Sequence, residues 1–443
     1  MRAASFRRLR RWTAEPPSHS GHAARIPRSR PGHVASTQGG KRNESDTAGP
    51  GVSARLARAW SIDDLRRLAQ RRLPRAVFDF IDGGAEDEIT LRDNRDAYAR
   101  IRLLPKVLLD VSNVDTSTDI LGARSELPLA VGPTGALGFG RRGADYSIAR
   151  AAASFGIPYS LATPATASIE GIAEATSGRH WFQCYMLKRA EFIFGLIERA
   201  RVAGYETLIV TVDLPVGGKR ERDFRNDFAI PFRFTARNVL DFASRPAWAF
   251  DMLRHGIPVQ ENLVGFEPEA TTAVQQASSV GSNWDPSFDW DRLQGVRDRW
   301  PRKLIVKGIV RPDDALRAAA LGADGIVVSN HGGRQLDGDI ATIDALPDVV
   351  AAVGGRMSVL IDGGIRRGRD IVKALALGAN AVLIGRPTVF GACAGGDAGA
   401  ERALSILREE LIRAMQLCGV RRIADIKPDL IAQGGAARHD TPA

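Results

Sequence analysis

The sequence predicts an α/β fold, a closed (β/α)8 TIM barrel with a helical N-terminal extension and a long loop after the fourth strand. Eight short runs of apolar and β-branched residues alternate with helical stretches, the order expected for parallel strands joined by helices. The runs span about 260 residues, close to the usual length of such a barrel. They lie at 127–132, 157–161, 181–185, 207–212, 304–307, 325–329, 359–362 and 381–384.

A repeated segment supports this fold. Residues 321–329 read LGADGIVVS and residues 377–385 read LGANAVLIG, and both fit a helix end, a turn and a strand. Successive βα units of one barrel would produce that pattern. Before the first strand, Ser61 precedes a helical stretch with Leu65 and Leu68, so we expect Ser61 to be a helix N-cap near the start of the folded body.

The positive charge of the chain is concentrated at its beginning. Residues 1–60 hold 12 lysines and arginines against three acidic residues, so only +1 of the formal net charge of +10 belongs to the rest. A nearly neutral body argues against nucleic-acid binding. Low hydrophobicity predicts a disordered basic tail over 1–58, a folded domain over 59–432 and a disordered end over 433–443. The Arg-rich opening has some transit-peptide character, and a mis-assigned start codon is the alternative.

The composition otherwise is that of a globular protein, with 44% hydrophobic residues. No window approaches 18 consecutive apolar residues, which excludes a membrane-spanning helix. The three cysteines, Cys184, Cys393 and Cys418, are scattered. They favour reduced thiols in a cytoplasmic protein over a disulfide framework or a metal site.

The connection after the fourth strand is about 90 residues long, and loops of that length usually carry a function or move. Within it, residues 229–285 form the predicted insertion. Aromatic and basic residues interleave at 232–237 and 246–254. Such segments lie on membrane surfaces. The alternative is a lid packed on the mouth of the barrel.

A glycine motif, G-x-G-x-x-G at 138–143, follows a strand and precedes a helix. A dinucleotide site would also require an acidic residue about 20 positions later, at the end of the next strand. That strand end reads SLATP at 160–164 and has no acidic residue. The sequence therefore excludes a Rossmann-type site.

The stretch with the most chemical information is SNHGGRQLDG at 329–338, directly after the sixth strand. The carboxyl ends of barrel strands form the active-site face, so His331 and Arg334 are expected to face the mouth. Flanking glycines let the backbone approach a ligand, which favours catalysis over a histidine that only caps a loop.

Two glycine-rich loops predict a phosphate site. Asp362, Gly363, Gly364 and Arg366 follow the seventh strand, and Gly385 and Arg386 follow the eighth. Barrels often bind phosphate between these two loops, where glycine exposes backbone N–H groups and arginine adds charge.

Over residues 61–430 the sequence resembles the FMN-dependent 2-hydroxy acid dehydrogenases and oxidases. This family includes glycolate oxidase, L-lactate dehydrogenase and mandelate dehydrogenase. The run at 329–337 is highly specific to it, and the patterns at 78–88, 181–185 and 370–379 are most similar to those of the bacterial mandelate and lactate dehydrogenases.

The resemblance implies the substrate-binding and catalytic residues. His331 would take a proton from the substrate, and Asp213 would stabilise the resulting imidazolium. Arg334 and Arg220 would bind the substrate carboxylate, for which the planar guanidinium is suited. Tyr185 would hydrogen-bond the substrate hydroxyl or carboxylate. Without the family, Asp213 could be a helix N-cap, Arg220 a solvated surface charge and Tyr185 a core residue.

FMN is the implied cofactor. Lys307 would lie at the pyrimidine edge of the flavin, where a fixed positive charge makes the ring a better electron acceptor. The remaining ring contacts would come from Pro133, Thr134, Gly135, Gln183, Thr211 and Ser329.

Four positions depart from the family pattern or set the shape of the pocket. Phe80 stands where relatives carry a tyrosine that contacts the substrate carboxylate, and Ala162 where serine commonly meets the flavin. Pro164 and Gly217 fall at positions that are bulkier in glycolate oxidase. These changes predict a roomier, less polar site, suited to an aryl or long-chain acid.

The expected reaction is therefore oxidation of an L-2-hydroxy acid to the 2-oxo acid. Gly135 and the insertion resemble dehydrogenases that pass electrons to a quinone or another carrier at the inner face of a membrane. The alternatives are an oxidase that reduces oxygen to hydrogen peroxide, a flavin barrel with isomerase-like chemistry, and a non-enzymatic binding protein. A homotetramer is expected by analogy.

Overall fold

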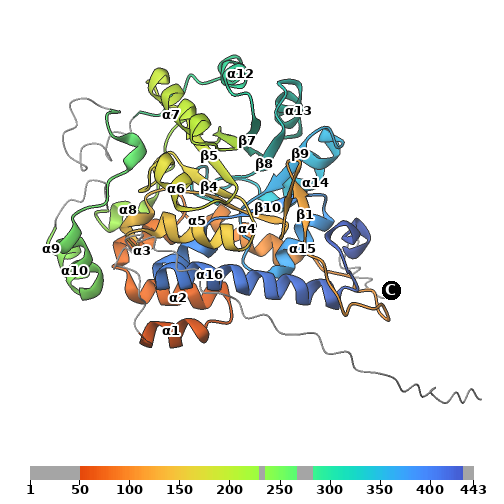
Figure 1. Cartoon of the computed structure of the whole chain (residues 1–443), viewed down its shortest axis with the longest axis horizontal. Coiled ribbons are helices and arrows are strands. Elements are labelled where there is room, and N and C mark those ends of the chain that lie inside the picture. Colours follow the sequence, from red (N-terminus) through yellow and green to blue (C-terminus); the bar gives the residue numbers. More distant parts are fainter. Residues whose placement is uncertain (1–49, 229–234, 267–282, 433–443) are drawn as a thin grey trace, which may run out of the picture. The chain divides into compact units, whose positions relative to one another are not determined.

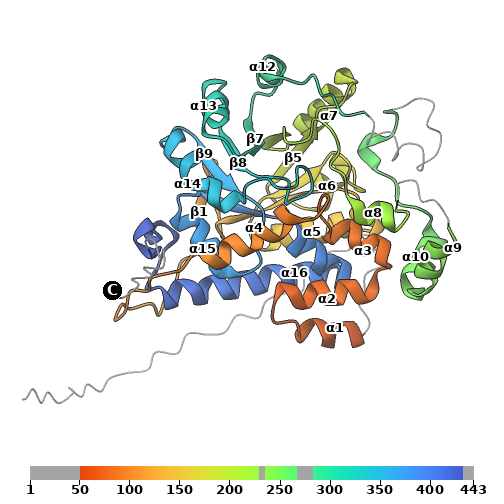
Figure 2. The same cartoon turned by 180° about the vertical axis from the view of Figure 1, so that it is seen from behind.

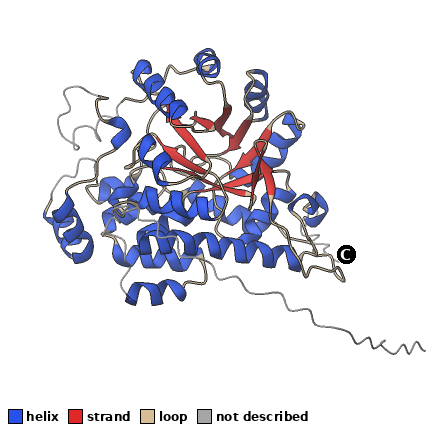
Figure 3. Cartoon of the chain, viewed as in Figure 1, coloured by secondary structure: helices blue, strands red, loops and turns tan. Residues whose placement is uncertain are grey.

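The computed structural model describes residues 50–228, 235–266 and 283–432. Eight parallel strands form a closed barrel, in which each strand pairs with its sequence neighbours and β10 pairs with β3 (Figure 1; Figure 3). The predicted strands are confirmed, each within two residues at either end. They are β3 (Leu129–Thr134), β4 (Tyr159–Ala162), β5 (His180–Tyr185), β6 (Thr207–Thr211), β7 (Lys303–Ile309), β8 (Gly325–Val328), β9 (Ser358–Ile361) and β10 (Ala381–Ile384).

A helix follows every strand and packs on the outside of the barrel (Figure 3). The last helix is kinked, because Gly395 and Gly396 have non-helical backbone angles. These helices are α5 (Ala144–Ser154), α6 (Ile169–Ala175), α7 (Ala190–Val202), α12 (Trp290–Arg299), α13 (Pro312–Ala320), α14 (Thr342–Val353), α15 (Gly368–Ala376) and α16 (Arg386–Leu417); the 3-10 turns η1 (Leu137–Phe139), η3 (Ile423–Asp425) and η4 (Pro428–Leu430) complete the connections.

Four helices precede the barrel: α1 (Pro50–Ala57), α2 (Ile62–Arg72), α3 (Arg75–Asp82) and α4 (Ile89–Arg100). Ser61 caps α2, since its side chain accepts a hydrogen bond from the N–H of Asp64, as predicted. The predicted tail boundary at residue 58 is wrong. Leu56 of α1 is buried against Gly395 of α16, and this contact orders a helix within an arginine-rich stretch. Residues 1–49 and 433–443 lie outside the described residues.

The interior of the barrel is filled by side chains, so it forms a core and leaves no pore. Alternate strand residues such as Trp181, Ile209 and Leu360 point inward and form one cluster. Ile120 and Leu121 join that cluster from the hairpin of β1 (Thr118–Ile120) and β2 (Ala123–Ser125). Leu121 lies near Gly325, the first residue of β8, so the hairpin closes the amino-terminal end of the barrel. The carboxyl ends of the strands remain for a site.

The described part of the insertion after β6 contains two helices and a 3-10 turn. It follows α8 (Glu221–Arg225) and contains α9 (Ala236–Ala243), α10 (Pro246–His255) and the turn η2 (Glu261–Leu263); α9 and α10 lie beside α3 and α8 in both views (Figure 1; Figure 2). The Asp241 carboxylate accepts the N–H groups of Arg75 and Ala76 at the start of α3, at 3.0 and 3.1 Å. Trp248 Nε1–H donates to the carbonyl of Phe139 at 2.8 Å. Residues 229–234 and 267–282 of the predicted insertion lie outside the described residues.

The glycine motif at 138–143 serves packing. A Cβ on Gly138 would lie 2.8 Å from the Thr166 hydroxyl, and one on Gly140 would lie 2.5 Å from the Cys393 sulfur. Both glycines therefore let the chain approach its neighbours closely. Within the described ranges, no helix has the length and hydropathy needed to cross a bilayer.

Candidate active site

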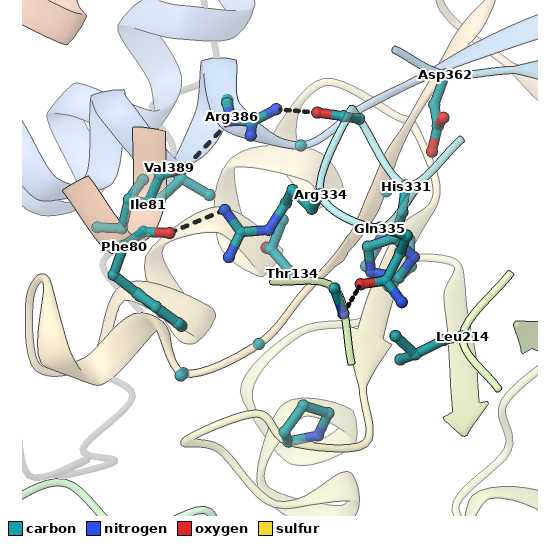
Figure 4. A pocket seen from close by; sticks show the side chains of 18 of the residues that line it. Phe80, Ile81, Thr134, Leu214, His331, Arg334, Gln335, Asp362, Arg386 and Val389 are labelled. Carbon is teal, nitrogen blue, oxygen red and sulfur yellow. Dashed lines mark hydrogen bonds between the residues drawn. The ribbon is translucent and has the colours of Figure 1, made fainter. Parts of the chain in front are cut away.

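A cavity of about 580 Å³ opens at the carboxyl ends of the barrel strands. Its walls come from the loops that follow the strands and from α3 and α8, and Figure 4 shows part of its lining. Most of the residues predicted for the site line it. They are Phe80, Pro133, Thr134, Gly135, Pro164, Tyr185, Gly217, Arg220, Lys307, His331, Arg334, Asp362, Gly363, Gly364, Arg366, Gly385 and Arg386.

His331 lies between a carboxylate and a phenol. Its Nδ1 is 2.9 Å from Asp213 Oδ1, and its Nε2 is 3.3 Å from the Tyr185 hydroxyl. The residue has a φ of 57°, in the left-handed region, and its N–H donates to Ser329 Oγ. This turn directly after β8 leaves one imidazole nitrogen held by a carboxylate while the other faces the cavity, the arrangement of an oriented proton acceptor.

The carboxylate of Asp213 lies beneath His331, and 11% of the side chain is exposed. Burial alone would raise the pKa of the Asp213 carboxyl, but the charges of His331 and Lys307 and the hydrogen bond from His331 outweigh it and hold the pKa below its usual value. Helix α8, which follows on the same loop, is capped by Arg220, so the described structure gives Asp213 no N-cap role there. The carboxylate instead fixes the orientation of the imidazole.

Lys307 is a buried cation at the cavity wall, with 4% of its surface exposed. Its ammonium group donates to Ser329 Oγ at 2.9 Å and lies 3.3 Å from Asp362 and 4.0 Å from Asp213. Burial lowers the pKa of Lys307, but the charges of Asp362 and Asp213 raise it by more than burial lowers it, so the net shift is upward. The side chain does not extend to solvent, and it keeps a positive charge facing the cavity.

Two arginines and Phe80 form a cationic corner of the cavity. Arg334 Nη1 donates to the carbonyls of Phe80 and Gly83, both at 2.9 Å, and Figure 4 shows the first of these bonds. Arg220 Nε donates to Asp223 at 2.8 Å. The guanidinium carbons of Arg334 and Arg220 lie 5.4 and 5.7 Å from the centre of the Phe80 ring, within cation–π range.

Burial, reinforced by the nearby charge of Arg220, lowers the pKa of Arg334 to about 10. Two guanidinium groups this close disfavour each other's charge. The corner therefore favours binding of an anion such as a carboxylate.

A second cationic group lies at the ends of β9 and β10. Arg386 donates to the carbonyls of Ile81, Gly332 and Gly83, at 3.1, 3.0 and 2.8 Å. Burial and the charges of Arg334 and Arg366 lower the pKa of Arg386 to about 9. Burial and Arg95 lower that of Arg366 to about 10, and Arg366 Nε is buried without a hydrogen-bond partner among the described residues.

Comparison with known proteins identifies the chain. The model of the FMN-dependent dehydrogenase family matches residues 69–433. The chain belongs to this family. It is 43% identical to (S)-mandelate dehydrogenase of Pseudomonas putida, over 85% of this chain and 94% of the relative. It is also 43% identical to L-lactate dehydrogenase of Caulobacter vibrioides, over 84% and 97%.

Solved structures agree with this assignment. The crystal structure of the monotopic membrane protein (S)-mandelate dehydrogenase superimposes with a TM-score of 0.82 and 42% identity, and the match covers 85% of this chain and all of that one. A mandelate oxidase bound to 3,3-difluoro-2-hydroxy-3-phenylpropionic acid matches with a TM-score of 0.70 and 36% identity, over 84% and 98%. The predicted membership of the FMN-dependent 2-hydroxy acid dehydrogenases is confirmed, and the chain is an FMN-dependent oxidoreductase.

The cavity of this FMN-dependent dehydrogenase suits its cofactor. Arg366 Nε and Asp362 Oδ1 are buried polar atoms without partners among the described residues, so both call for a polar ligand. Gly363 and Gly364 have φ of +88° and +80°, which favour glycine. Arg386, Arg366 and the backbone of Gly363 and Gly364 would hold the FMN phosphate, the Asp362 oxygen would accept from a hydroxyl group of the cofactor, and Lys307 would supply a positive charge to the flavin ring.

Five predicted residues lie behind the cavity wall: Ala162, Gln183, Thr211, Asp213 and Ser329. Asp213 hydrogen-bonds His331, and Ser329 accepts a hydrogen bond from Lys307. Gln183 Nε2 donates to Thr211 Oγ1 at 3.0 Å, both side chains are buried, and Ala162 is beside Gln183 in the barrel register. Their direct contact with FMN stays a prediction.

Several other residues that the sequence did not predict also line the cavity, including Leu214, Phe228, Gln260, Trp284 and Gln335. Leu214 follows Asp213 and Gln335 follows Arg334, so their places next to predicted site residues could have indicated that they line the cavity. Gln260 and Trp284 flank the undescribed part of the insertion, and no local motif marks them. Only the folded chain shows that they reach the cavity.

Proposed function

We propose that this enzyme oxidises an L-2-hydroxy acid to the corresponding 2-oxo acid, with His331 as the base. The proposal depends on the observation that one cavity contains both an oriented imidazole and a pair of guanidinium groups. An oriented imidazole, paired with Asp213 at 2.9 Å, faces the same space as the guanidinium groups of Arg334 and Arg220. A hydroxy acid needs both, a proton acceptor for its reacting end and a cationic clamp for its carboxylate.

Arg334 and Arg220 bind the substrate carboxylate in this proposal. Both arginines line the cavity beside Phe80, whose ring offers an apolar surface and no hydroxyl. The Tyr185 hydroxyl, 3.3 Å from His331, donates to the substrate hydroxyl or carboxylate. These contacts place the hydroxyl-bearing carbon next to His331 Nε2.

The reaction removes two electrons and two protons from the hydroxyl-bearing carbon and its hydroxyl group. His331 Nε2 accepts one of these protons, and ionised Asp213 stabilises the imidazolium that results. FMN, when bound, would supply the acceptor for the two electrons and for the second proton. Lys307 keeps its positive charge at the wall throughout, because Asp362 and Asp213 hold it protonated.

The test is the visible spectrum of the full chain with FMN under anaerobic addition of mandelate, lactate, glycolate and longer 2-hydroxy acids. Bleaching of the flavin band by one of them is expected. A flavin that no hydroxy acid reduces would contradict the proposal and favour isomerase-like chemistry, for which Phe80 is the motivating departure. A chain that cannot be loaded with FMN would point to a non-enzymatic role.

The proposed electron acceptor is a quinone or another electron carrier. The similarity to the (S)-mandelate dehydrogenase structure supports it, whereas the 36% identity to a mandelate oxidase supports the second candidate, reduction of oxygen to hydrogen peroxide. Turnover under air with and without a soluble quinone separates them. Stoichiometric peroxide, with no gain in rate from the quinone, would establish the oxidase.

We also propose that the insertion binds a membrane surface as a peripheral contact, at the inner face. Leu240, Phe250 and Leu253 of α9 and α10 expose 72%, 64% and 85% of their surface beside Arg254. Apolar and basic side chains on one short helical segment favour anionic lipid. Sedimentation with anionic liposomes is the test, and a protein left entirely in the supernatant would exclude this contact. The predicted tetramer stays a prediction.

A further inference from the structure

An asparagine outside the barrel contacts the β8 loop (residues 329–341), which carries His331. Asn94 lies on α4, and α4 packs beside α14 (Figure 1; Figure 2). Its side chain and that of Asn330, the residue before His331, are each 2% exposed. Their amides form a reciprocal pair, since each Nδ2 donates to the Oδ1 of the other at 2.9 Å. Neither residue is among those that line the cavity, so any role in the reaction is indirect.

Asn330 closes the turn from which the imidazole projects. His331, Gly332 and Gly333 have φ of 57°, 64° and 72°, so three successive residues lie in the left-handed region. A histidine in this region is unfavourable and depends on support from its surroundings. Asn330 gives that support, because its Oδ1 accepts the N–H of Gly333 at 3.2 Å and its Nδ2 donates to the carbonyl of Ile340 at 3.0 Å. The amide therefore holds the backbone that presents the base.

Asn94 also contacts the β9 loop (residues 362–367), which would hold the FMN phosphate. A Cβ on Gly364 would lie 1.9 Å from the Asn94 carbonyl oxygen, and one on Gly363 would lie 3.3 Å from Asn94 Oδ1. Glycine at both positions therefore lets the loop lie directly on the backbone and the amide of Asn94. One residue thus contacts the loop of the base and the loop of the cofactor phosphate.

Further hydrogen bonds attach α4 to both loops. Thr342, at the start of α14, donates its N–H to Asn94 Oδ1 at 3.2 Å and its hydroxyl to the carbonyl of Asp362 at 2.5 Å. At the start of α4, the N–H of Thr90 donates to the carboxylate of Asp337 in the β8 loop at 2.9 Å. A displacement of Asn94 would therefore be transmitted to the β8 loop and the β9 loop together.

We propose that Asn94 is a positioning residue that holds the β8 and β9 loops in one arrangement through its pair with Asn330. The affinity for FMN and the rate of proton removal by His331 then depend on the same two amides. The effect on His331 rests on the proposed function, whereas the effect on FMN affinity rests on the cofactor alone. Because both amides are buried, truncation of one leaves polar atoms of the other without a partner, which is costly.

Asn94→Ala, Asn330→Ala and the double variant test the pair in the full chain, and alanine at position 94 preserves the helix. The first measurement is the Kd for FMN, from the fluorescence of FMN released when the holoenzyme is diluted. We expect it to rise roughly 5- to 100-fold in each single variant, the effect of one buried polar group left unpaired.

The second measurement is the rate of anaerobic flavin reduction at saturating FMN, with whichever of mandelate, lactate and glycolate reduces the wild type fastest. We expect a fall of roughly 10- to 100-fold, since a small displacement of a catalytic group has effects of this size. In both measurements the double variant should resemble either single variant, because the second truncation removes an interaction that the first has already broken.

Ser125→Ala is the matched control. Ser125 is buried at the amino-terminal end of the barrel, and its hydroxyl donates to the carbonyl of Leu127 at 2.8 Å, so this variant also loses one buried hydrogen bond. It should unfold at a lower temperature than the wild type, with the same Kd for FMN and the same rate of reduction.

Three results would overturn the proposal. In Asn94→Ala, the first is a loss of stability alone, and the second is a change in only one of the two measurements. The third is that the effects of the single variants multiply in the double variant. Asn94→Ser, which keeps a polar group, replaces Asn94→Ala if the latter does not fold. If no hydroxy acid reduces the wild-type flavin, the proposed function fails, and the Kd for FMN then decides the proposal by itself.

Discussion

Two regions of the cavity wall are built differently. One is formed by the ends of β6, β7 and β8, and the other is formed by the insertion. At the strand ends, Asp213, Lys307 and His331 are linked to one another and to Ser329, within 4.0 Å at each step. The insertion is fixed to the body by separate contacts, such as those of Asp241 and Trp248. Where the side chains are interconnected, as at the strand ends, one substitution disturbs several interactions. Where the contacts are separate, as in the insertion, one substitution removes one interaction.

The largest effect is expected from His331→Asn. Asparagine tolerates the positive φ at this position, but it offers no basic nitrogen between Asp213 and the cavity. We expect the rate of flavin reduction by the best hydroxy acid to fall about 10²- to 10⁴-fold, the usual contribution of a general base. Anaerobic stopped-flow spectroscopy measures it.

The flavin band should persist in His331→Asn, because the phosphate loops are untouched. His255→Asn, an exposed histidine on α10, is the matched control and should reduce at the wild-type rate. A near-normal rate in His331→Asn would show that another group takes the proton. It would contradict the proposed role of His331 as the base.

Lys307→Met tests the linkage through stability. The substitution removes the buried cation that lies 3.3 Å from Asp362 and 4.0 Å from Asp213, although Asp213 keeps its contact with His331, and breaking a buried pair in this way typically costs about 3–5 kcal/mol. Lys303 lies on the same strand and forms an exposed ion pair with Asp324 at 2.9 Å. Lys303→Met should therefore cost about 1 kcal/mol or less. Equal shifts of the two variants in thermal unfolding would refute the difference.

These two walls also mark how far the sequence could predict the site. His331, Lys307 and the loops of Gly363 and Gly385 each follow a strand directly, and strand ends converge in a barrel, so local pattern was enough to place them. Ala162 and Gln183 belong to strands as well, but whether their side chains point toward the cavity depends on the register of the strands in the barrel. Gln260 and Trp284 come from a connection whose path follows no local period, so only tertiary structure brings them to the cavity.

Asp145 of α5 allows a test by pH outside both walls. Its carboxyl is buried, and burial raises its pKa to about 6, although Thr166 donates a hydrogen bond to it at 2.5 Å. A folded pKa above the unfolded one favours the protonated form. The contribution to stability is therefore full below about pH 4 and is lost as pH rises through 6, by about 2–3 kcal/mol.

Asp145→Asn is neutral at every pH, so it should remove this loss. Denaturant unfolding at pH 4.5 and pH 8 should show a gain for the variant at pH 8 that shrinks at pH 4.5. Asp397→Asn, which breaks the exposed pair with Arg150, is the matched control and should show less dependence on pH. A gain that is equal at both pH values would mean that Asp145 does not titrate in this range.

The smallest effect is expected from Trp248→Phe, which removes one contact of the insertion. The ring stays apolar, but the hydrogen bond that Trp248 donates to the carbonyl of Phe139 is lost, so we expect a cost of about 1–2 kcal/mol. Because the other contacts at Asp241 remain, the loss should be local. Limited proteolysis should cut within 229–285 faster than in the wild type, while thermal unfolding of the barrel changes little. Trp60→Phe, at a tryptophan 72% exposed, is the matched control and should change neither. If Trp248→Phe reduced the flavin more slowly while the rate of proteolytic cleavage stayed unchanged, the insertion would be coupled to the site of His331.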